Sequence, residues 1–126
     1  MIAYDAQYDP PAPIIQVTVS SARNRRLRQL CSAILDTGAD ITAIPEIYLE
    51  RLQLYPIRQL QFEDWDGDTT TTFTYKIGMS LDELVIPQLE VVLTGLNFVV
   101  IGRDVLNRLN LHFYGPQQLF QIDLSE

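Results

Sequence analysis

Short apolar segments separated by turn-forming residues dominate this chain, and they restrict it to a mostly β fold. The segments are rich in β-branched and aromatic residues, with Gly, Pro or acidic residues between them. Stretches with the 3.6-residue period of an amphipathic helix are scarce. Because 126 residues suffice for one hydrophobic core but not for two full domains, we expect one domain over residues 14–126. Residues 1–13 are expected to form an N-terminal arm that can be mobile.

The pattern predicts eight strands in this domain. They are Ile14–Ser20, Leu30–Leu35, Ile57–Phe62, Thr69–Met79, Leu84–Leu93, Phe98–Ile101, Leu111–Tyr114 and Leu119–Leu124. In Thr69–Met79, one face is predicted to be apolar and the other to carry Thr70, Thr72, Thr74 and Lys76. Phe98–Ile101 is apolar throughout, which is typical of a strand buried on both faces.

Two short helices and two hairpins connect these strands. One helix is expected at Glu46–Leu52, with Thr42 as an upstream cap, and the other at Val105–Leu109, capped by Asp104. The pair Asp66-Gly67 between two strands is a hairpin signal, and the last two strands are expected to form a closing hairpin.

The charge of the chain disfavours a polyanionic partner. Sixteen acidic residues against nine Lys and Arg give a net charge of -7, so we expect neither a nucleic acid nor an anionic membrane as partner. The basic segment Arg23–Arg28 is an exception: a solvated loop is the favoured interpretation, and attraction for an acidic partner or nucleic acid is the alternative. With neither a membrane-length apolar run nor a signal-peptide pattern, we expect a cytoplasmic or otherwise soluble intracellular protein.

The chain has few side chains for metal or thiol chemistry. Its one cysteine, Cys31, cannot form an internal disulfide, and with His112 as the one histidine no zinc site of Cys and His is available. We expect Cys31 to pack as a small hydrophobic residue and His112 to lie at the surface or an interface. Chemistry must then come from carboxylates, hydroxyls and backbone, and we expect no metal and no cofactor.

The segment Ile34–Asp40 is the first candidate for chemistry. Two apolar residues run directly into Asp36, Thr37 and Gly38, which delivers a carboxylate on a turn at the end of a buried strand. Burying such a group without partners is costly. Taken alone, however, the tripeptide is more often an ordinary strand-ending turn in which the acid accepts backbone hydrogen bonds.

A second segment, Phe98–Leu106, follows about 60 residues later and changes this interpretation. Together the two segments resemble the retropepsins, the retroviral-type aspartic proteases and their cellular relatives. In that family an apolar-apolar-Asp-Thr-Gly-Ala loop is followed by an apolar-apolar-Gly-Arg-Asp/Asn segment, and the two cross at the base of the active site. The resemblance covers about Ile14 to Leu111.

The resemblance implies a single-lobe acid protease fold that is active as a two-fold homodimer. The lobe is a closed, β-barrel-like sheet with a short helix near the C-terminus. Peptide hydrolysis by carboxylates needs two of them sharing a proton, and this chain holds one Asp-Thr-Gly. Because 126 residues cannot supply a second lobe, the second aspartate must be Asp36 of another copy.

The resemblance also implies roles for the residues of the first segment. Asp36 is the catalytic acid and base, and the Thr37 hydroxyl locks the two loops across the axis. Gly38 lets the backbone approach the substrate. Ala39 and Asp40 line the subsites beside the scissile bond, with Asp40 binding the substrate backbone.

The second segment is implied to support this loop. Gly102 lies at the crossing, and Arg103 pairs with the acid at position 40. Asp104 completes the motif. The alternative for Arg103 and Asp104 is a helix start with an exposed ion pair of little energetic value.

The hairpin Phe62–Phe73 occupies the place of the flap that closes over the substrate in this family, and its tip residues Trp65, Asp66 and Gly67 are expected to contact substrate. Retroviral flap tips are apolar and glycine-rich, whereas this one is acidic. Its four acids are Glu63, Asp64, Asp66 and Asp68. A solvated turn is the alternative, and the spacing disfavours a calcium loop. If the hairpin is a flap, its charge favours substrates with basic residues.

These observations lead to two hypotheses of different classes. The first is a homodimeric aspartic endopeptidase that hydrolyses extended polypeptides with a water activated by an Asp36 dyad. The second is a non-catalytic, dimeric, retropepsin-like module that binds peptides or acts as a scaffold. In both, the terminal strands of the two chains are expected to interleave into a sheet that holds the dimer together.

Overall fold

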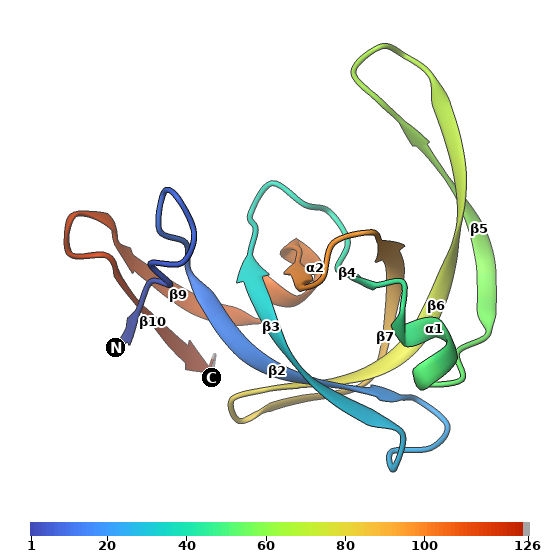
Figure 1. Cartoon of the computed structure of the whole chain (residues 1–126), viewed down its shortest axis with the longest axis horizontal. Coiled ribbons are helices and arrows are strands. Elements are labelled where there is room, and N and C mark those ends of the chain that lie inside the picture. Colours follow the sequence, from blue (N-terminus) through green and yellow to red (C-terminus); the bar gives the residue numbers. More distant parts are fainter. Residues whose placement is uncertain (125–126) are drawn as a thin grey trace.

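The computed structural model describes residues 1–124 and confirms the mostly β architecture (Figure 1). The strands are β1 Ile2–Ala3, β2 Ile14–Ser21, β3 Arg28–Leu35, β4 Ala43–Pro45, β5 Pro56–Glu63, β6 Thr69–Leu81, β7 Leu84–Thr94, β8 Val99–Ile101, β9 Leu109–Tyr114 and β10 Leu119–Leu124. Two single-turn helices, α1 Tyr48–Arg51 and α2 Arg103–Leu106, and a 3-10 turn at Gly115–Gln117 complete the described elements. No helix in this part of the chain is long and apolar enough to cross a membrane.

Six strands close into a barrel. Their order is β2-β3-β8-β4-β7-β6, with β5 added outside β6, and a further pairing of β2 with β6 closes the ring. Most neighbours are antiparallel, but β8 runs parallel to β3, and β4 runs parallel to β7. This closed lobe, with α2 near the C-terminus, confirms the expected β-barrel-like sheet with a short helix near the C-terminus.

The barrel interior is the hydrophobic core. Alternate residues of β2 and β3 point inward, as their two-residue period predicts. In β6 the predicted alternation is wrong at its start, where Phe73 is exposed and Thr74 is buried. Val19, Ala33, Ile77, Val91, Val99 and Ile101 have no solvent exposure. Cys31 is buried among these side chains, as expected of a small hydrophobic residue. The strand β8 lies between β3 and β4 inside the sheet, which explains why all of its residues are apolar.

Both helices differ from their predicted extents. The first is a single turn from Tyr48 to Arg51, and no side chain caps it, so Thr42 is not its cap. The second begins at Arg103 with Gly102 as N-cap, which makes the predicted capping role of Asp104 wrong. The physical reason is that Thr42 and Asp104 bind each other, as described below.

The two ends of the chain form a second, three-stranded sheet of order β1-β10-β9. The start of the N-terminal arm is held in it, because Ile2 and Ala3 pair with Phe120 and Leu119, and the Tyr4 N–H donates to the Gln118 carbonyl (2.8 Å). Phe120 is fully buried beneath this sheet. All three strands of this sheet thus come from one chain.

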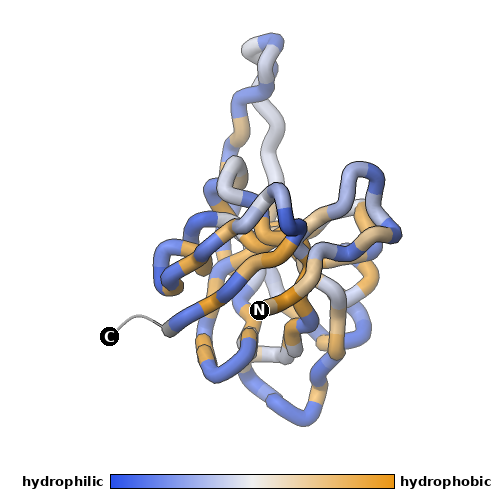
Figure 2. The backbone as a smooth tube through the Cα atoms, turned by 90° about the vertical axis from the view of Figure 1, so that its left-hand side faces the viewer, coloured by the Kyte–Doolittle hydropathy of each residue, from blue (hydrophilic) through white to orange (hydrophobic). Residues whose placement is uncertain are grey.

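The hairpin of β5 and β6 extends beyond the barrel as a long arm (Figure 1). Its base is anchored because β6 also pairs with β2 and β7 inside the barrel. Figure 2 shows that the arm stands away from the body and ends in a hydrophilic tip, whereas the hydrophobic residues concentrate in the body. The arm projects from the same side of the lobe as the loop that follows β3 (Figure 1).

Candidate active site

Asp36 stands at the common end of two parallel strands. The register pairs Leu35 of β3 with Ile101 of β8, and the Asp36 N–H donates to the Ile101 carbonyl at 2.9 Å. The two segments singled out from the sequence therefore meet here. Asp36 is half-buried, while Thr37 and Gly38 directly after it are exposed. The carboxylate is thus held by a buried sheet at the open edge of the lobe.

The loop from Asp36 to Asp40 folds back onto its own aspartate. One carboxylate oxygen of Asp36 accepts the Gly38 N–H (2.8 Å), and the Asp36 carbonyl accepts the Ala39 N–H (3.2 Å). A Cβ on Gly38 would lie 3.2 Å from that same carboxylate oxygen, so glycine allows this close approach. The turn therefore fixes the orientation of the carboxyl group.

Gly102 lies where the second segment crosses beneath this loop. A Cβ on Gly102 would lie 2.9 Å from both the Ala39 carbonyl oxygen and the Ile41 carbonyl carbon. The next residue donates its N–H to the same Ala39 carbonyl at 2.9 Å. The crossing is therefore backbone against backbone, which leaves no space for a side chain at position 102.

Arg103 holds the outer side of the loop at two points. Its guanidinium donates to the Thr37 carbonyl at 2.7 Å and also to a carboxylate oxygen of Asp40. The side chains of Arg103 and Asp40 are 44% and 84% exposed, so their ion pair adds little to the free energy of folding. Its effect is geometric, because one planar group binds both ends of a four-residue stretch.

A buried contact between Thr42 and Asp104 holds the inner side. The Thr42 hydroxyl donates to one Asp104 carboxylate oxygen (2.7 Å) and accepts the Gly102 N–H (3.1 Å). The second carboxylate oxygen accepts the Thr42 N–H (3.0 Å). Sequence reasoning missed Thr42 as a site residue. The available signal was a hydroxyl within the apolar run Ile41–Ile44, directly after the loop.

The residues expected at the flap tip, Trp65, Asp66 and Gly67, belong to the turn between β5 and β6. The end of this arm stands apart from the loop that follows β3 (Figure 1). The side chain of Trp65 is fully exposed. The turn is built on Asp64, whose carboxylate accepts the N–H groups of Asp66 and Asp68, each at 2.9 Å. Gly67 has a φ of 82°, a conformation that favours glycine.

The carboxylates of Asp64, Asp66 and Asp68 come within 4.8 Å of one another, and all three are exposed. Hydrogen bonds of the turn already use one of these carboxylates. The turn that Asp64 stabilises therefore explains why the three carboxylates lie close together.

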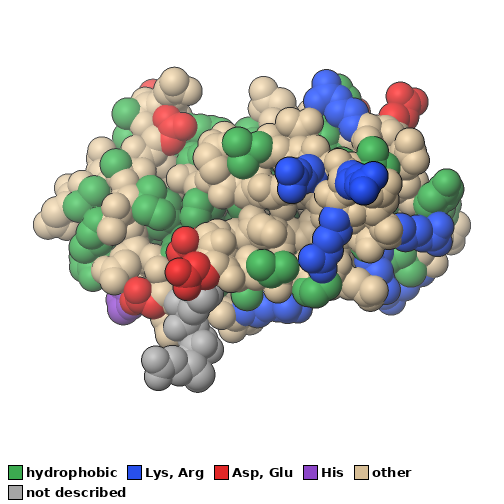
Figure 3. Space-filling view, turned by 90° about the horizontal axis from the view of Figure 1, so that it is seen from below, with side chains coloured by type: hydrophobic (Ala, Val, Ile, Leu, Met, Phe, Trp, Pro, Cys, Tyr) green, Lys and Arg blue, Asp and Glu red, His purple; other side chains and the backbone are tan. Residues whose placement is uncertain are grey.

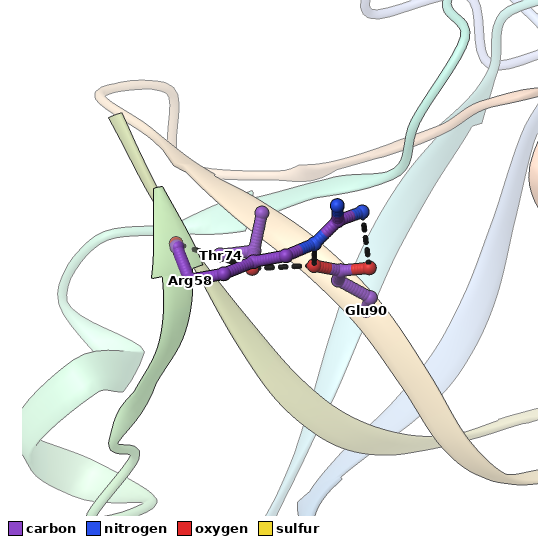
Figure 4. A network of polar contacts seen from close by, with 3 residues as sticks. All are labelled: Arg58, Thr74 and Glu90. Atoms are coloured by element: carbon purple, nitrogen blue, oxygen red, sulfur yellow. Dashed lines mark hydrogen bonds and ion pairs between the residues drawn. The ribbon is translucent and has the colours of Figure 1, made fainter. Parts of the chain in front are cut away.

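A network of three residues braces the base of the arm (Figure 4). Arg58 of β5 donates to both carboxylate oxygens of Glu90 on β7, at 2.6 and 3.0 Å, and so reaches across β6. Thr74 of β6 lies buried between them and donates to Glu90 at 2.5 Å. The hydrogen bond from Arg58 and then that from Thr74 lower the pKa of Glu90 to about 2.

Comparison with known proteins agrees with this geometry. A sequence model of the retroviral aspartyl protease family matches residues 10–114, which include both segments of the site. No curated protein matches the chain.

Several solved structures share the fold at low sequence identity. A retropepsin-like aspartic protease from Rickettsia conorii is 14% identical, with a TM-score of 0.64 over 96% of this chain and 86% of its own. The simian foamy virus protease is 17% identical (TM-score 0.56; 73% and 89% coverage). The EIAV protease, solved with the inhibitor HBY-793, is 21% identical (TM-score 0.54; 76% and 86% coverage). By family match and by fold, this chain belongs to the retroviral aspartyl protease family.

Proposed function

We propose that this protein is an aspartic endopeptidase whose catalytic residue is Asp36. The observation that carries the proposal is the placement of Asp36 at the joint end of β3 and β8, where its N–H donates to the Ile101 carbonyl and Gly38 orients its carboxylate. Arg103 and the Thr42–Asp104 pair support the same loop from its two sides. A structural turn alone does not require bracing of this extent.

The reaction needs a second carboxylate beside the first. In the proposed dyad, two copies of Asp36 share one proton. The unprotonated copy takes a proton from water as the water oxygen attacks the peptide carbonyl carbon, and the protonated copy donates its proton to the carbonyl oxygen. Proton transfer to the amide nitrogen then lets the C–N bond break and releases a carboxylic acid and an amine. This mechanism uses no metal and no cofactor.

A second copy of this chain is the proposed source of that carboxylate. The sequence contains one Asp-Thr-Gly, and a two-fold axis at this loop places two equivalent aspartates together. Thr37 is exposed beside Asp36, which suits the proposed contact of its hydroxyl with the partner loop. The active enzyme is therefore a homodimer.

We propose that β9 joins the two copies. In the described sheet, β9 has β10 on one side, so its other edge carries backbone groups free to pair with another strand. Exposed Phe113 and Tyr114 lie on β9, and between Asp104 and Asp123 the one charged residue is Arg108. Two such edges can therefore meet without the repulsion that a net charge of -7 otherwise imposes.

The substrate is proposed to be an extended polypeptide held between the loop and the arm. Gly38, Ala39 and Asp40 would form the floor beside the dyad, with exposed Asp40 able to accept a backbone N–H from the substrate. Trp65, Asp66 and Gly67 would cover the substrate from the arm after the two chains associate. Because the arm pairs with the barrel only at its base, its tip has room to move over a bound peptide.

Replacing the catalytic group tests the proposal. Asp36→Asn removes the acid and base function but keeps the shape of the side chain, so it should abolish cleavage of an unfolded protein while the circular dichroism spectrum stays unchanged. Undiminished cleavage by this variant would falsify the mechanism. A pepstatin-type transition-state mimic should bind with one molecule per two chains, and one molecule per chain would contradict the shared dyad.

A non-catalytic, dimeric peptide-binding or scaffold module is the second candidate. The acidic arm tip, with all its carboxylates exposed, favours this candidate because it differs from the apolar tips expected of a flap. Digestion of a peptide library separates the two functions. Cleavage that depends on Asp36 excludes the pure binding module, whereas peptide capture by the wild-type protein without cleavage supports it.

A further inference from the structure

A hollow of about 380 Å³ lies on the flank of the barrel, at the base of the β5–β6 arm. The turn between β2 and β3, the start of β5 and the outer face of β6 and β7 enclose it. Its walls include Arg23, Gln53, Tyr55, Ile57, Lys76 and Gln88. None of the residues of the candidate active site lines this hollow.

The turn that carries Arg23 is preorganised. The buried Ser21 hydroxyl accepts the N–H groups of Arg23 (3.2 Å) and Asn24 (3.3 Å), and the Asn24 carbonyl accepts the Leu27 N–H (3.0 Å). The Arg23 guanidinium then lies over the Tyr55 ring, 5.0 Å from its centroid. This cation–π contact holds the guanidinium at the rim of the hollow while its N–H donors stay available.

The positive charges of the hollow have no carboxylate partner within 4 Å among the described residues. Neither Arg23 nor Lys76 forms an ion pair there. Glu90, which lies opposite Lys76 in the β6–β7 pairing, is already bound by two guanidinium nitrogens of Arg58 and by Thr74. The hollow thus keeps two positive charges in a chain whose net charge is -7.

The surroundings strengthen this local positive field. Arg25 and Arg26 follow on the same β2–β3 turn, Arg28 begins β3, and all three are exposed. Seen from below, Lys and Arg side chains gather over one half of the surface (Figure 3). Charges of one sign around a concave site raise the local concentration of an oppositely charged ligand.

We propose that this hollow binds an acidic segment of a polypeptide. Arg23 and Lys76 would bind carboxylates, Tyr55 and Ile57 would contact an apolar neighbour, and Gln53 and Gln88 would offer amide groups to the peptide backbone. Two cations beside an apolar wall in one open, compact hollow favour a peptide. A nucleic acid strand instead needs an extended positive groove with stacking platforms.

The location gives the site a specific use, which rests on the proposed function. A protein substrate can present an acidic segment here while a distant part of the same chain lies in the proposed catalytic cleft. The contact would raise the effective concentration of the scissile segment. The hollow is therefore a secondary recognition site that selects substrates by acidity away from the cleaved bond.

Binding is measured best on the Asp36→Asn protein, so that its result does not depend on catalysis. The probe is a fluorescein-labelled peptide in which Glu and Asp flank Leu, followed by fluorescence anisotropy at low salt. Charge reversal by Arg23→Glu or Lys76→Glu should weaken binding by about tenfold or more, because attraction becomes repulsion. The matched control Arg108→Glu reverses an exposed charge outside the hollow and should leave the affinity unchanged.

Each outcome decides the proposal. Equal losses in all three variants indicate a general charge effect and overturn it, as does absence of binding to the peptide. Preferential binding of a single-stranded oligonucleotide overturns it in favour of a nucleic acid.

In the active enzyme, a substrate with an added acidic segment should show a lower KM than the same substrate without it. Arg23→Glu should raise the KM back to the value measured without the segment. If the KM does not change although the peptide binds, the hollow is still a binding site for acidic peptides, but its proposed role in substrate selection is wrong.

Discussion

Thr42 and Asp104 are joined by two hydrogen bonds across 62 residues of sequence, one through the threonine hydroxyl (2.7 Å) and one through its backbone N–H (3.0 Å). The same hydroxyl accepts the N–H of Gly102, so one side chain holds the crossing of the two segments. Thr42 is fully buried. Water cannot reach this point to replace a lost hydrogen-bond partner. Removing either partner should therefore lower the free energy of unfolding by more than the usual net value of one hydrogen bond.

Removing the Thr42 hydroxyl should destabilise the fold. Thr42→Val keeps the volume of the side chain but leaves the buried Gly102 N–H without a partner, at a cost of about 1–3 kcal/mol. It also removes one hydrogen bond from an Asp104 oxygen, which keeps the Val105 N–H as a donor. Urea denaturation measures the free energy of unfolding. The control Thr42→Ser keeps the hydroxyl and should lose less stability than Thr42→Val. Equal losses in the two variants would show that packing of the methyl group, and not the hydrogen bonds, is what matters.

Gly102→Ala should damage the site through a steric clash with backbone. The new methyl group would lie 2.9 Å from the Ala39 carbonyl oxygen and the Ile41 carbonyl carbon, neither of which can move without displacing the loop. Overpacking of this kind costs about 1–3 kcal/mol. Thermal unfolding and peptide cleavage should both show the loss. The control is Gly95→Ala, where a Cβ meets nothing within 4 Å, and a similar loss there would refute the steric explanation.

Arg103→Lys should separate the effect on activity from the effect on stability. Lysine keeps the positive charge but cannot bind Thr37 and Asp40 together with a planar fork, so the loop loses one of its two outer contacts. Because the pair is exposed, we expect a stability loss below about 1 kcal/mol. We expect a clearly larger relative loss of kcat/KM. A variant that loses stability and activity in proportion would contradict a positioning role, and Arg108→Lys is the control.

The contact of Glu90 with Arg58 and Thr74 predicts a pH-dependent contribution to stability. The pKa of Glu90 is lowered from 4.5 to about 2 in the folded protein, so folding favours the charged carboxylate. This stabilisation is present above about pH 4.5 and is lost as the pH falls toward 2. Glu90→Gln should therefore lower the Tm at neutral pH, and the difference from wild type should narrow on acidification.

The exposed Glu83 is the control for this measurement, since Glu83→Gln should leave the Tm nearly unchanged at every pH. A Glu90→Gln difference that stays constant between pH 6 and the acid limit of the folded state would show that the ionised carboxylate is not the stabilising form. More than half of the Arg58 side chain is exposed to solvent, so added salt should also reduce the stabilisation by this ion pair.

Local sequence was sufficient to predict most strands and the residues that meet at the candidate site. Two-residue alternation located β2, β6 and β10 closely, and the apolar run before Gly102 located β8, because these patterns follow from which face of a strand is buried. The short helices were predicted less well. A single turn carries too little periodicity to define its ends, and Asp104 satisfied the rules for a cap while binding Thr42 instead.

The sequence by itself determined that this chain is a mostly β lobe with one Asp-Thr-Gly and an acidic hairpin, since burial pattern and turn chemistry are local properties. Only the tertiary structure decided which distant polar groups meet. Thr74 was predicted to lie on a polar face, but it is buried beneath the contact between Arg58 of β5 and Glu90 of β7. The tertiary structure also paired β1 with β10 of the same chain. Such contacts depend on strand order and register, which no stretch of sequence encodes alone.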